Sequence, residues 1–348
     1  MQRWTTRPEG STWGDFGADD ELGRANLLTP DAVKAAVREV REGLVFCLSL
    51  PLEYPGANKL APARFPPIVE PTRAPDGKIR FNYPRRIEDP SLTDVICDDQ
   101  VNLWCQYSTQ WDSLAHVGSE FDADGDGEAE IRFYNGWQGG TDVIGPVTYG
   151  ADGRVEETGP HQGALKLGVD KMAAKGMQGR GVMVDLFRHH GRERTFVGYD
   201  ELMAAMEAGG AEVEAGDMLC LYTGFADMLL EMRTEPDGHA LHNTCAVLDG
   251  RDDRLLQWIA DSGVVCLIAD NFAVEGIPAR PGQGEKFASL PLHEACLFKL
   301  GVNLGELWYL TELNRWLADH GRNRFLLTAP PLRLTGAVGS PVTPIATV

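Results

Sequence analysis

The chain has 348 residues, of which 51 are acidic and 32 basic, so its formal net charge at pH 7 is −19. Such an acidic surface repels the phosphates of nucleic acids and anionic lipids, which argues against nucleic acid and membranes as partners. Hydrophobic residues make up 43% of the chain, enough for a large core without disulfides. The seven cysteines form no Cys-x-x-Cys pair, a usage typical of a reducing compartment.

The chain carries no pattern that predicts export or membrane insertion. Its first residues lack the apolar stretch of a secretory signal, and no run of 18 apolar residues predicts a transmembrane helix. We therefore expect a cytoplasmic protein. Because no repeat and no compositional break divides the sequence, we expect a single domain over residues 1–348, with an N-terminal arm and helix at 1–43.

The first part of the chain predicts a helix, a strand and a long irregular segment. Thr29 is a suitable N-cap for the helical pattern that follows it, and residues 44–50 are apolar and predict a strand. Residues 53–90 are rich in Pro, Arg and Asn and predict a long irregular excursion over the surface, a kind of loop that often acts as a lid. Residues 95–97 and 101–105 predict short strands.

The second part alternates between buried strands and helices. Apolar runs predict strands at residues 181–187, 218–223 and 264–270. Helical patterns at 200–208 and 254–263 lie between them, and glycines end both. This alternation predicts the α/β class.

One segment between the two parts gathers side chains that could carry chemistry: Gln106, Gln110, Asp112 and His116. Oxygen ligands two and four residues apart can converge from a turn followed by a short helix or strand, and an Asp near a His is a common acid/base arrangement. The spacing alone also fits a polar turn whose side chains satisfy backbone groups.

Two further residues stand out near the C-terminus. His293 lies on an apolar, helix-like stretch that Gly301 would end, and such a His is often a hydrogen-bonded core residue. Glu306 lies in an equally apolar run. A carboxylate in that setting must be paired, protonated or bound to a metal ion.

Two other clusters have metal-like spacing. The acidic run at 122–126 begins like an EF-hand loop, but Phe133 stands where the bidentate Glu would be, so a solvated acidic turn is the alternative to calcium. His239, His242 and Cys245 have a spacing that could serve zinc, although no second cluster of matching type lies nearby.

The segment at 106–116 resembles the signature His-x-Gly-Thr-His-x-Asp-x-Pro-x-His of the Putative cyclase family, which includes bacterial kynurenine formamidase and isatin hydrolase. Thr109, Asp112 and His116 match the signature, whereas Gln106 and Gln110 replace its two ligand histidines. Ser and Leu replace its glycine and proline. The resemblance continues in the same order over residues 12–346, with landmarks at 13–30, 179–185, 216–224, 269–275, 292–293, 305–306 and 339–341.

The resemblance implies a single-domain α/β protein with the swivelling β/β/α fold of kynurenine formamidase, assembled as a homo-oligomer, a dimer or tetramer. It implies that His116 transfers protons, with Asp112 as its catalytic neighbour. The family's metal ligands fall on Gln106, Gln110, Asp112, His293 and Glu306.

The two glutamines bear on the choice of cofactor. Amide oxygens favour oxygen-preferring ions, so we expect one divalent ion, Mn²⁺ or Zn²⁺, with Mg²⁺ as a third candidate. Three aromatic side chains near the signature could line a pocket for an aromatic or cyclic small molecule, or be plain core: Trp104, Tyr107 and Trp111.

These residues predict a metal-dependent hydrolase that cleaves an amide, a cyclic amide or a lactone with metal-activated water. One alternative is a lyase, dehydratase or cyclase that acts on a polyketide-like or other cyclic intermediate at the same site. A second alternative, to which the missing ligand histidines point, is a non-catalytic small-molecule binding protein.

Overall fold

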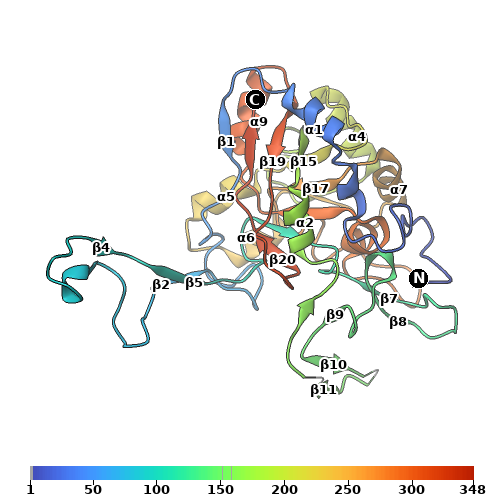
Figure 1. Cartoon of the computed structure of the whole chain (residues 1–348). Coiled ribbons are helices and arrows are strands. Elements are labelled where there is room, and N and C mark those ends of the chain that lie inside the picture. Colours follow the sequence, from blue (N-terminus) through green and yellow to red (C-terminus); the bar gives the residue numbers. More distant parts are fainter. Residues whose placement is uncertain (1–2, 151, 158) are drawn as a thin grey trace.

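A mixed nine-stranded sheet forms the centre of the computed structural model, which describes residues 3–150, 152–157 and 159–348 (Figure 1). The four inner strands β13, β15, β17 and β18 run parallel, and the strands beyond them pair antiparallel. In order across the sheet, the strands are β1 (Val45–Cys47), β21 (Ile345–Thr347), β19 (Arg324–Thr328), β13 (Gln178–Asp185), β15 (Met218–Tyr222), β17 (Cys266–Ala269), β18 (Asn303–Glu306), β6 (Gln110–Asp112) and β20 (Gly339–Pro341).

Helices cover both faces of this sheet, which explains why the parallel strands are continuous apolar runs. Alternate strand residues point to opposite faces, so Val182 and Leu219 pack with one set of helices, and Met183 and Cys220 with the other. The first set comprises α4 (Tyr199–Gly209), α7 (Asp253–Ser262) and the π-helix η4 (Glu294–Leu300); the second comprises α2 (Val169–Lys175) and α9 (Thr311–Asp319).

The strongest sequence signals are confirmed. Helix α1 (Pro30–Val37) begins after Thr29, whose hydroxyl accepts the amide of Ala32. Helices α4 and α7 end at left-handed Gly210 and Gly263, and the predicted α/β class is the observed one. Shorter elements complete the body: α3 (Phe187–His190), β14 (Thr195–Val197), α5 (Phe225–Met232), α6 (Gly238–Asn243), β16 (Ala246–Leu248) and α8 (Pro291–His293).

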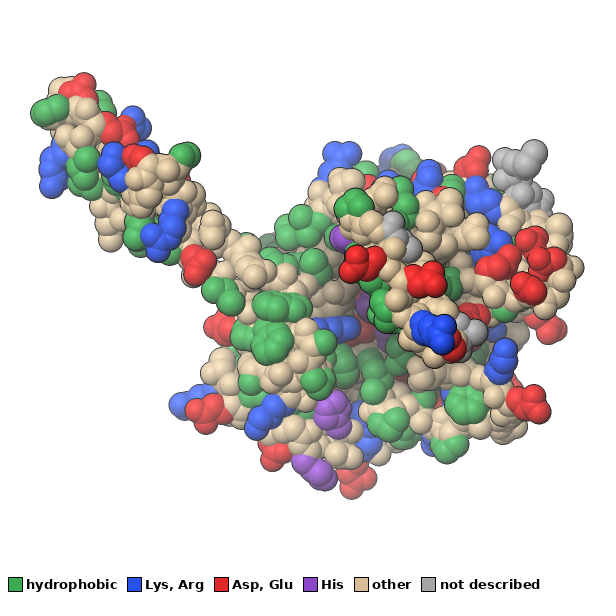
Figure 2. All heavy atoms as spheres, turned by 90° about the horizontal axis from the view of Figure 1, so that it is seen from below, with side chains coloured by type: hydrophobic (Ala, Val, Ile, Leu, Met, Phe, Trp, Pro, Cys, Tyr) green, Lys and Arg blue, Asp and Glu red, His purple; other side chains and the backbone are tan. Residues whose placement is uncertain are grey.

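A two-stranded ribbon, residues 66–103, projects from the body and is called the arm below (Figures 1 and 2). Strand β2 (Ile68–Pro71) pairs with β5 (Asp99–Asn102), and β3 (Tyr83–Pro84) pairs with β4 (Val95–Ile96). The prediction of an irregular excursion is therefore wrong for these strands. The strands predicted at 95–97 and 101–105 overlap β4 and the end of β5, and residues 103–105 lie outside any strand. Since both faces of the ribbon are exposed, its sequence lacks the alternation that marks a half-buried strand.

A second small β region, residues 119–164, is called the lobe. It contains three antiparallel strand pairs: β7 (Ser119–Phe121) with β8 (Glu130–Arg132), β10 (Val147–Tyr149) with β11 (Val155–Glu157), and β9 (Val143–Ile144) with β12 (Gly163–Ala164). The sequence did not predict these strands, because each is only two or three residues long.

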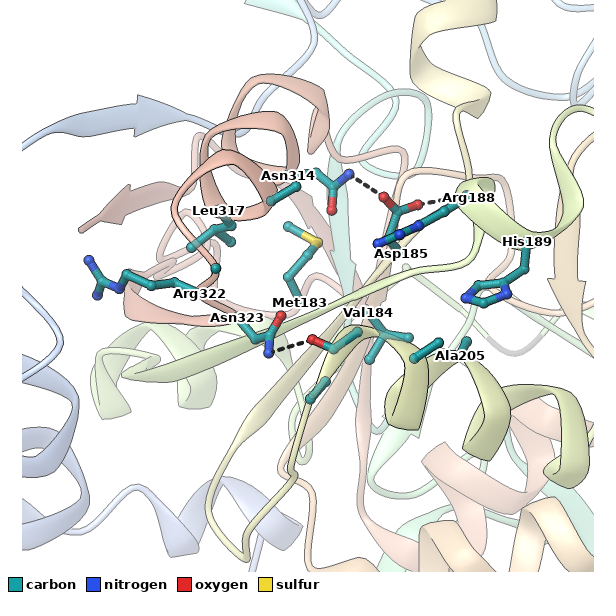
Figure 3. Close-up of a pocket in the computed structure, with 15 residues that line it drawn as sticks. Met183, Val184, Asp185, Arg188, His189, Ala205, Asn314, Leu317, Arg322 and Asn323 are labelled. Carbon is teal, nitrogen blue, oxygen red and sulfur yellow. Dashed lines mark hydrogen bonds between the residues drawn. The ribbon is translucent and has the colours of Figure 1, made fainter.

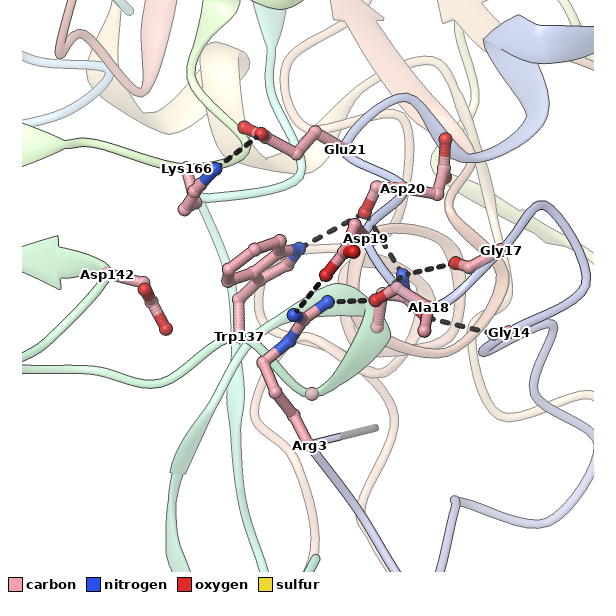
Figure 4. Close-up of polar contacts among 12 residues, drawn as sticks. Arg3, Gly14, Gly17, Ala18, Asp19, Asp20, Glu21, Trp137, Asp142 and Lys166 are labelled. Atoms are coloured by element: carbon pink, nitrogen blue, oxygen red, sulfur yellow. Dashed lines mark hydrogen bonds and ion pairs between the residues drawn. The ribbon is translucent and has the colours of Figure 1, made fainter. Parts of the chain in front are cut away.

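The N-terminal segment is fastened to the lobe by polar contacts around Trp137 (Figure 4). The guanidinium of Arg3 lies 3.4 Å from the centre of the Trp137 ring and donates to the carbonyl of Ala18. Lys166 lies 4.7 Å from the same ring, and the indole donates to the carbonyl of Asp20. These contacts hold the segment before α1 in one path across the lobe. No helix in the described ranges is long and apolar enough to cross a membrane.

Candidate metal and catalytic site

Three buried ligand-type side chains meet where β6 lies beside β18: Asp112, His293 and Glu306. One potential ligand atom of each lies within 4.8 Å of the others. Asp112 ends β6, Glu306 ends β18, and His293 ends helix α8. Antiparallel pairing of β6 with β18 therefore brings together residues almost 200 positions apart, as the resemblance implied for the metal site.

Gln110 faces the same group. Its amide nitrogen lies 3.4 Å from Asp112 Oδ1 and 3.3 Å from Glu306 Oε2. Its own Oε1 and the Oδ2 of Asp112 are buried, and neither has a hydrogen-bond partner among the described residues. Buried polar atoms are normally satisfied, so two unpartnered oxygens beside a carboxylate and a histidine fit a bound cation.

Gln106 lies at the edge of this group. Its amide packs against Gly339, the strand neighbour of Asp112, so closely that a Cβ at Gly339 would lie 2.3 Å from Gln106 Nε2. No hydrogen bond of its side chain to the group is found among the described residues. The main-chain carbonyl of Gln106 accepts a 2.7 Å hydrogen bond from Arg64 Nη1.

The prediction that Trp111 binds substrate is wrong. Because side chains alternate along a strand, Trp111 points to the face opposite Gln110 and Asp112. It is completely buried, its indole donates to the carbonyl of Ala329, and its ring packs edge-on against Trp308.

Tyr107 and Trp104, the other two predicted substrate-binding residues, have no contact with the candidate metal ligands among the described residues. The hydroxyl of Tyr107 donates to the carbonyl of Ala57 at 2.8 Å, and that side chain is buried. Trp104 is half-buried and packs against Phe65, with ring centres 5.2 Å apart. Both contacts attach the segment around residues 57–65 to the signature segment.

His293 is held between two carboxylates. Its Nδ1 lies 2.7 Å from Glu275 Oε1, which also accepts the main-chain amide of His293, and its Nε2 lies 3.3 Å from Glu306 Oε1. Burial disfavours the charged imidazole, but the hydrogen bonds to Glu275 and Glu306 outweigh it and raise the pKa of His293 to about 10. The contact with Glu275 leaves Nε2 as the nitrogen that can bind a metal ion.

Glu275 is a further candidate site residue, to which the sequence reasoning gave no role. It is fully buried, and its second oxygen accepts the amide of Leu292. It follows Ala273 and Val274, whose φ angles are +72° and +59°. Such angles cost roughly 1–3 kcal/mol each in non-glycine residues and cluster at functional sites. The signal was available: like Glu306, Glu275 is a carboxylate in an apolar run.

The turn after Glu306 is held in a similar way. Leu307 has a φ of +56°, and its carbonyl accepts a 2.5 Å hydrogen bond from the Thr109 hydroxyl. The same hydroxyl accepts the amide of Leu50. The matched signature residue Thr109 thus fixes the backbone beside a candidate ligand.

His116 lies next to the group and is its most accessible member. Its Nε2 is 3.7 Å from Asp112 Oδ1, and its side chain is 19% exposed, against 0–3% for Asp112, His293 and Glu306. Burial, and then the charge on His293, lower the pKa of His116 to about 4. His116 is therefore neutral near pH 7 and can accept a proton.

Arg64 adds positive charge to this carboxylate-rich site. Burial and the neighbouring Glu306 raise the pKa of Asp112, and Arg64 acts in the opposite direction. The charge of Arg64 also lowers the pKa of His116 and of Glu306. The sequence reasoning missed Arg64, which lies in the excursion predicted at 53–90.

The two other candidate metal clusters have different outcomes. The acidic run lies at the exposed turn between β7 and β8, where the two carboxylate oxygens of Asp122 accept the amides of Gly125 and Gly127. Asp122, Asp124 and Asp126 are close enough to share a cation. His239, His242 and Cys245 form no such group among the described residues.

A separate cavity of about 180 Å³ lies at the carboxyl end of β13 (Figure 3). It shares no lining residue with the group around Asp112. Its acidic residue, Asp185, accepts hydrogen bonds from the main chain of Arg188 and from the Asn314 side chain. These contacts give Asp185 a role in joining β13 to helices α3 and α9.

Comparisons with known proteins agree with this fold. A solved structure described as a novel cyclase shares 28% identity, with a TM-score of 0.72 and 97% of each chain covered. Isatin hydrolase A from Labrenzia aggregata, bound to benzyl benzoate, shares 14% identity over 90% of this chain and 95% of its own, with a TM-score of 0.52. Isatin hydrolase A from Ralstonia solanacearum shares 15% identity over 91% and 97%, with a TM-score of 0.51.

A search of curated proteins finds no significant match. The family described as "Putative cyclase" matches residues 46–276, which include the signature segment, the arm and Glu275. That match covers most of the chain and agrees with the cyclase fold, so the chain belongs to this family.

Proposed function

We propose that the protein is a metal-dependent hydrolase that cleaves an amide, a cyclic amide or a lactone. The observation that carries this proposal is the buried group of Asp112, His293 and Glu306 with unpartnered oxygens on Asp112 and Gln110. The likeness to two isatin hydrolases supports the same class of reaction.

The residues that would hold one divalent ion are Asp112, Glu306, His293 through Nε2 and Gln110 through Oε1. Such a mixture of oxygen and nitrogen donors suits Mn²⁺ or Zn²⁺, with Mg²⁺ as the weaker candidate because one of the donors is an imidazole nitrogen and Mg²⁺ prefers oxygen. When bound, the ion would activate water and polarise the scissile carbonyl. Glu275 would keep the His293 ring in the required orientation.

His116 is the group that moves protons. It is neutral near pH 7, so its Nε2 can take a proton from the attacking water and later give that proton to the leaving nitrogen or oxygen. Asp112 lies 3.7 Å from this nitrogen and favours the charged form that exists between the two transfers. Water is added across the C–N or C–O bond, giving a carboxylate and an amine or alcohol.

The positive charge of Arg64 favours an uncharged amide or lactone as the substrate. Hydrolysis of such a substrate creates negative charge on the carbonyl oxygen and leaves a carboxylate in the product. The guanidinium of Arg64 donates to the main-chain carbonyl of Gln106, and its charge lowers the pKa of His116. It would stabilise this developing charge.

The test uses the purified full-length protein with Mn²⁺ or Zn²⁺ and a panel of cyclic amides and lactones, with isatin as the first compound. We expect a product heavier than the substrate by one water. A product lighter by one water would favour the cyclase or dehydratase alternative. Tight binding without any product, unchanged by chelator, would favour a binding protein and overturn the proposal.

The seven cysteines are all free, which supports a reducing compartment such as the cytoplasm.

A further inference from the structure

The cavity at the carboxyl end of β13 is built by the topology of the sheet (Figure 3). Strand β19 begins at Arg324, which pairs with Val182, so the last three residues of β13 run past the end of that neighbour. Helices α4 and α9 lie on opposite faces of the sheet, and both border the space that this arrangement leaves. The cavity of about 180 Å³ is therefore a feature of the fold and separate from the group around Asp112.

Small side chains keep this cavity open. Six of its lining residues are alanine or glycine: Ala205, Ala208, Gly209, Ala211, Ala318 and Gly321. A cavity of about 150 Å³ is large enough to hold a benzene ring. The space at the end of β13 can therefore hold the body of a small cyclic or branched molecule.

One wall of the cavity is apolar. It is formed by Met183, Val184 and Leu317, whose exposed fractions are at most 3%. Water gains little from contact with such side chains, so an apolar group of a ligand that covers them is stabilised. This wall therefore favours a ligand with an aliphatic or aromatic body.

Another wall presents hydrogen-bond acceptors. Each carboxylate oxygen of Asp185 accepts one hydrogen bond, from the main-chain amide of Arg188 at 2.9 Å and from Asn314 Nδ2 at 2.8 Å. A carboxylate can accept about four, so Asp185 keeps acceptor capacity. Because Asn314 donates to Asp185, its own oxygen points the other way, toward Met183 (Figure 3). A donor group such as an ammonium can meet both acceptors.

A cation stands beside this carboxylate. The side chain of Arg188 lines the cavity and is exposed, and Figure 3 shows its guanidinium directed toward Asp185. Among the described residues, only the main-chain amide of Arg188 bonds to Asp185, and no partner is found for the guanidinium. The other lining arginine, Arg322, donates to the main-chain carbonyl of Glu39. An arginine with free donors pairs well with a carboxylate, often through two parallel hydrogen bonds.

We propose that the cavity at the end of β13 binds a small apolar amino acid as a zwitterion. The ammonium of the ligand meets Asp185 and the Asn314 oxygen, its carboxylate meets Arg188, and its side chain packs on the apolar wall. A ligand with a single charge would leave either Arg188 or Asp185 unmatched. A polar side chain would lose its hydrogen bonds to water against the apolar wall.

The test is calorimetric titration of the full-length protein, freed of metal by chelation because amino acids also bind metal ions. The probes are L-valine, L-leucine and L-phenylalanine, and we expect saturable binding by at least one of them. Analogues that lack one charge, such as 3-methylbutylamine and 4-methylpentanoate for leucine, should bind roughly tenfold or more weakly. Each of them loses hydrogen bonds between charged groups.

Substitutions at two exposed positions locate the site. Arg188→Gln removes the cation and should weaken binding of the amino acid roughly tenfold or more, with Arg315→Gln, exposed on α9 and outside the cavity, as its control. Ala208→Leu places a larger side chain in the cavity and should abolish binding. Its control is Ala204→Leu, at an exposed alanine of α4 that does not line the cavity. Far-ultraviolet circular dichroism checks that each variant is folded.

Three outcomes would overturn the proposal. The first is the absence of saturable binding by all three amino acids. The second is an analogue with one charge that binds as tightly as the parent amino acid, and the third is binding that either cavity variant leaves unchanged. Since every measurement uses metal-free protein, none of these outcomes depends on the hydrolase activity.

Discussion

At the scale of single residues, the imidazole of His293 is contacted by a carboxylate at each ring nitrogen. Glu275 holds Nδ1 and Glu306 faces Nε2, so the metal-free protein keeps the ring protonated, with a pKa raised to about 10 from an ordinary value of 6.5. This stabilisation is complete below pH 6.5 and is lost as the pH rises through 10. A metal ion at Nε2 would replace the proton.

Metal binding should therefore release protons. At pH 8 the metal-free His293 is charged, and a metal ion requires its neutral form. We expect the uptake of Mn²⁺ or Zn²⁺ to release at least one proton and the affinity to rise with pH toward 10. Calorimetry in two buffers with different heats of ionisation measures this directly. Binding at pH 8 with no proton release would contradict the assignment of His293 as a ligand.

Glu275 should affect the metal more than the fold. In Glu275→Gln, the single amide oxygen can replace only one of the two carboxylate oxygens that accept the main-chain amides of Leu292 and His293, and the negative charge beside His293 is lost. Changes of this kind cost roughly 10–100-fold in metal affinity. Glu312→Gln, the same change at an exposed position of α9, is the control. Equal metal affinity in the two variants would show that Glu275 does not orient a ligand.

His116 should matter for turnover but not for metal content. Replacing His116 with Gln keeps a polar side chain of similar size but removes the proton acceptor. General acid/base groups contribute roughly 10²–10⁴-fold to the rate, so we expect turnover to fall by that factor. Metal content, measured in parallel, should stay at the wild-type level. A variant with wild-type turnover would remove His116 from the mechanism.

The sequence could predict part of this site. Asp112, His116 and Glu306 follow from the signature and from a carboxylate in an apolar run. Trp111 was misassigned, because the strand that turns its side chain away from Asp112 is only three residues long and has no readable alternation. Arg64 could not be assigned, because a single Arg in a Pro-rich segment gives no indication of where its charge will lie.

At the scale of elements, strand β13 and its antiparallel neighbour β19 are packed too tightly for extra volume. A Cβ added at Gly181 of β13 would lie 2.3 Å from the ring of Phe325, which is completely buried in the neighbouring strand β19. Inserting a methyl group into such a core typically costs 1–3 kcal/mol. Close contact of β13 with β19 therefore requires glycine at this position.

We accordingly expect Gly181→Ala to lower the free energy of unfolding by about 1–3 kcal/mol. Gly209→Ala is the matched control, since Gly209 ends helix α4 and no atom lies within 4 Å of its added Cβ. That variant should be unchanged or more stable by up to about 1 kcal/mol. Urea denaturation compares the two, and equal stabilities would contradict this account of the packing.

The elements that could be predicted are those with strong local signals. The apolar runs of β13, β15 and β17 and the capped helices α1, α4 and α7 were all found from the sequence. Strand β6 could not be identified, because it is short and two of its three side chains are polar although all three are buried. Its place in the sheet comes from pairing with β18, a contact over a long sequence separation.

At the scale of the whole molecule, the chain separates into a body that contains the candidate site and an arm that projects from it (Figures 1 and 2). Every hydrogen bond and ion pair found among the described residues of the arm joins two residues of the arm itself.

The excursion at 53–90 shows what the sequence could not supply at this scale. Its length and composition predicted a segment outside the core, and the segment does leave the core. Its pairing into a ribbon could not be predicted, because hydrogen bonds between two exposed strands leave no hydrophobic pattern.

The central claim is that Asp112, His293 and Glu306 hold one catalytic ion. Elemental analysis of protein purified without chelator, combined with activity before and after metal removal, tests it most directly. We predict about one divalent ion per chain, its loss in Asp112→Asn and His293→Gln, and recovery of activity in the wild-type protein when Mn²⁺ or Zn²⁺ is restored. Full activity in protein that contains no metal would contradict the claim.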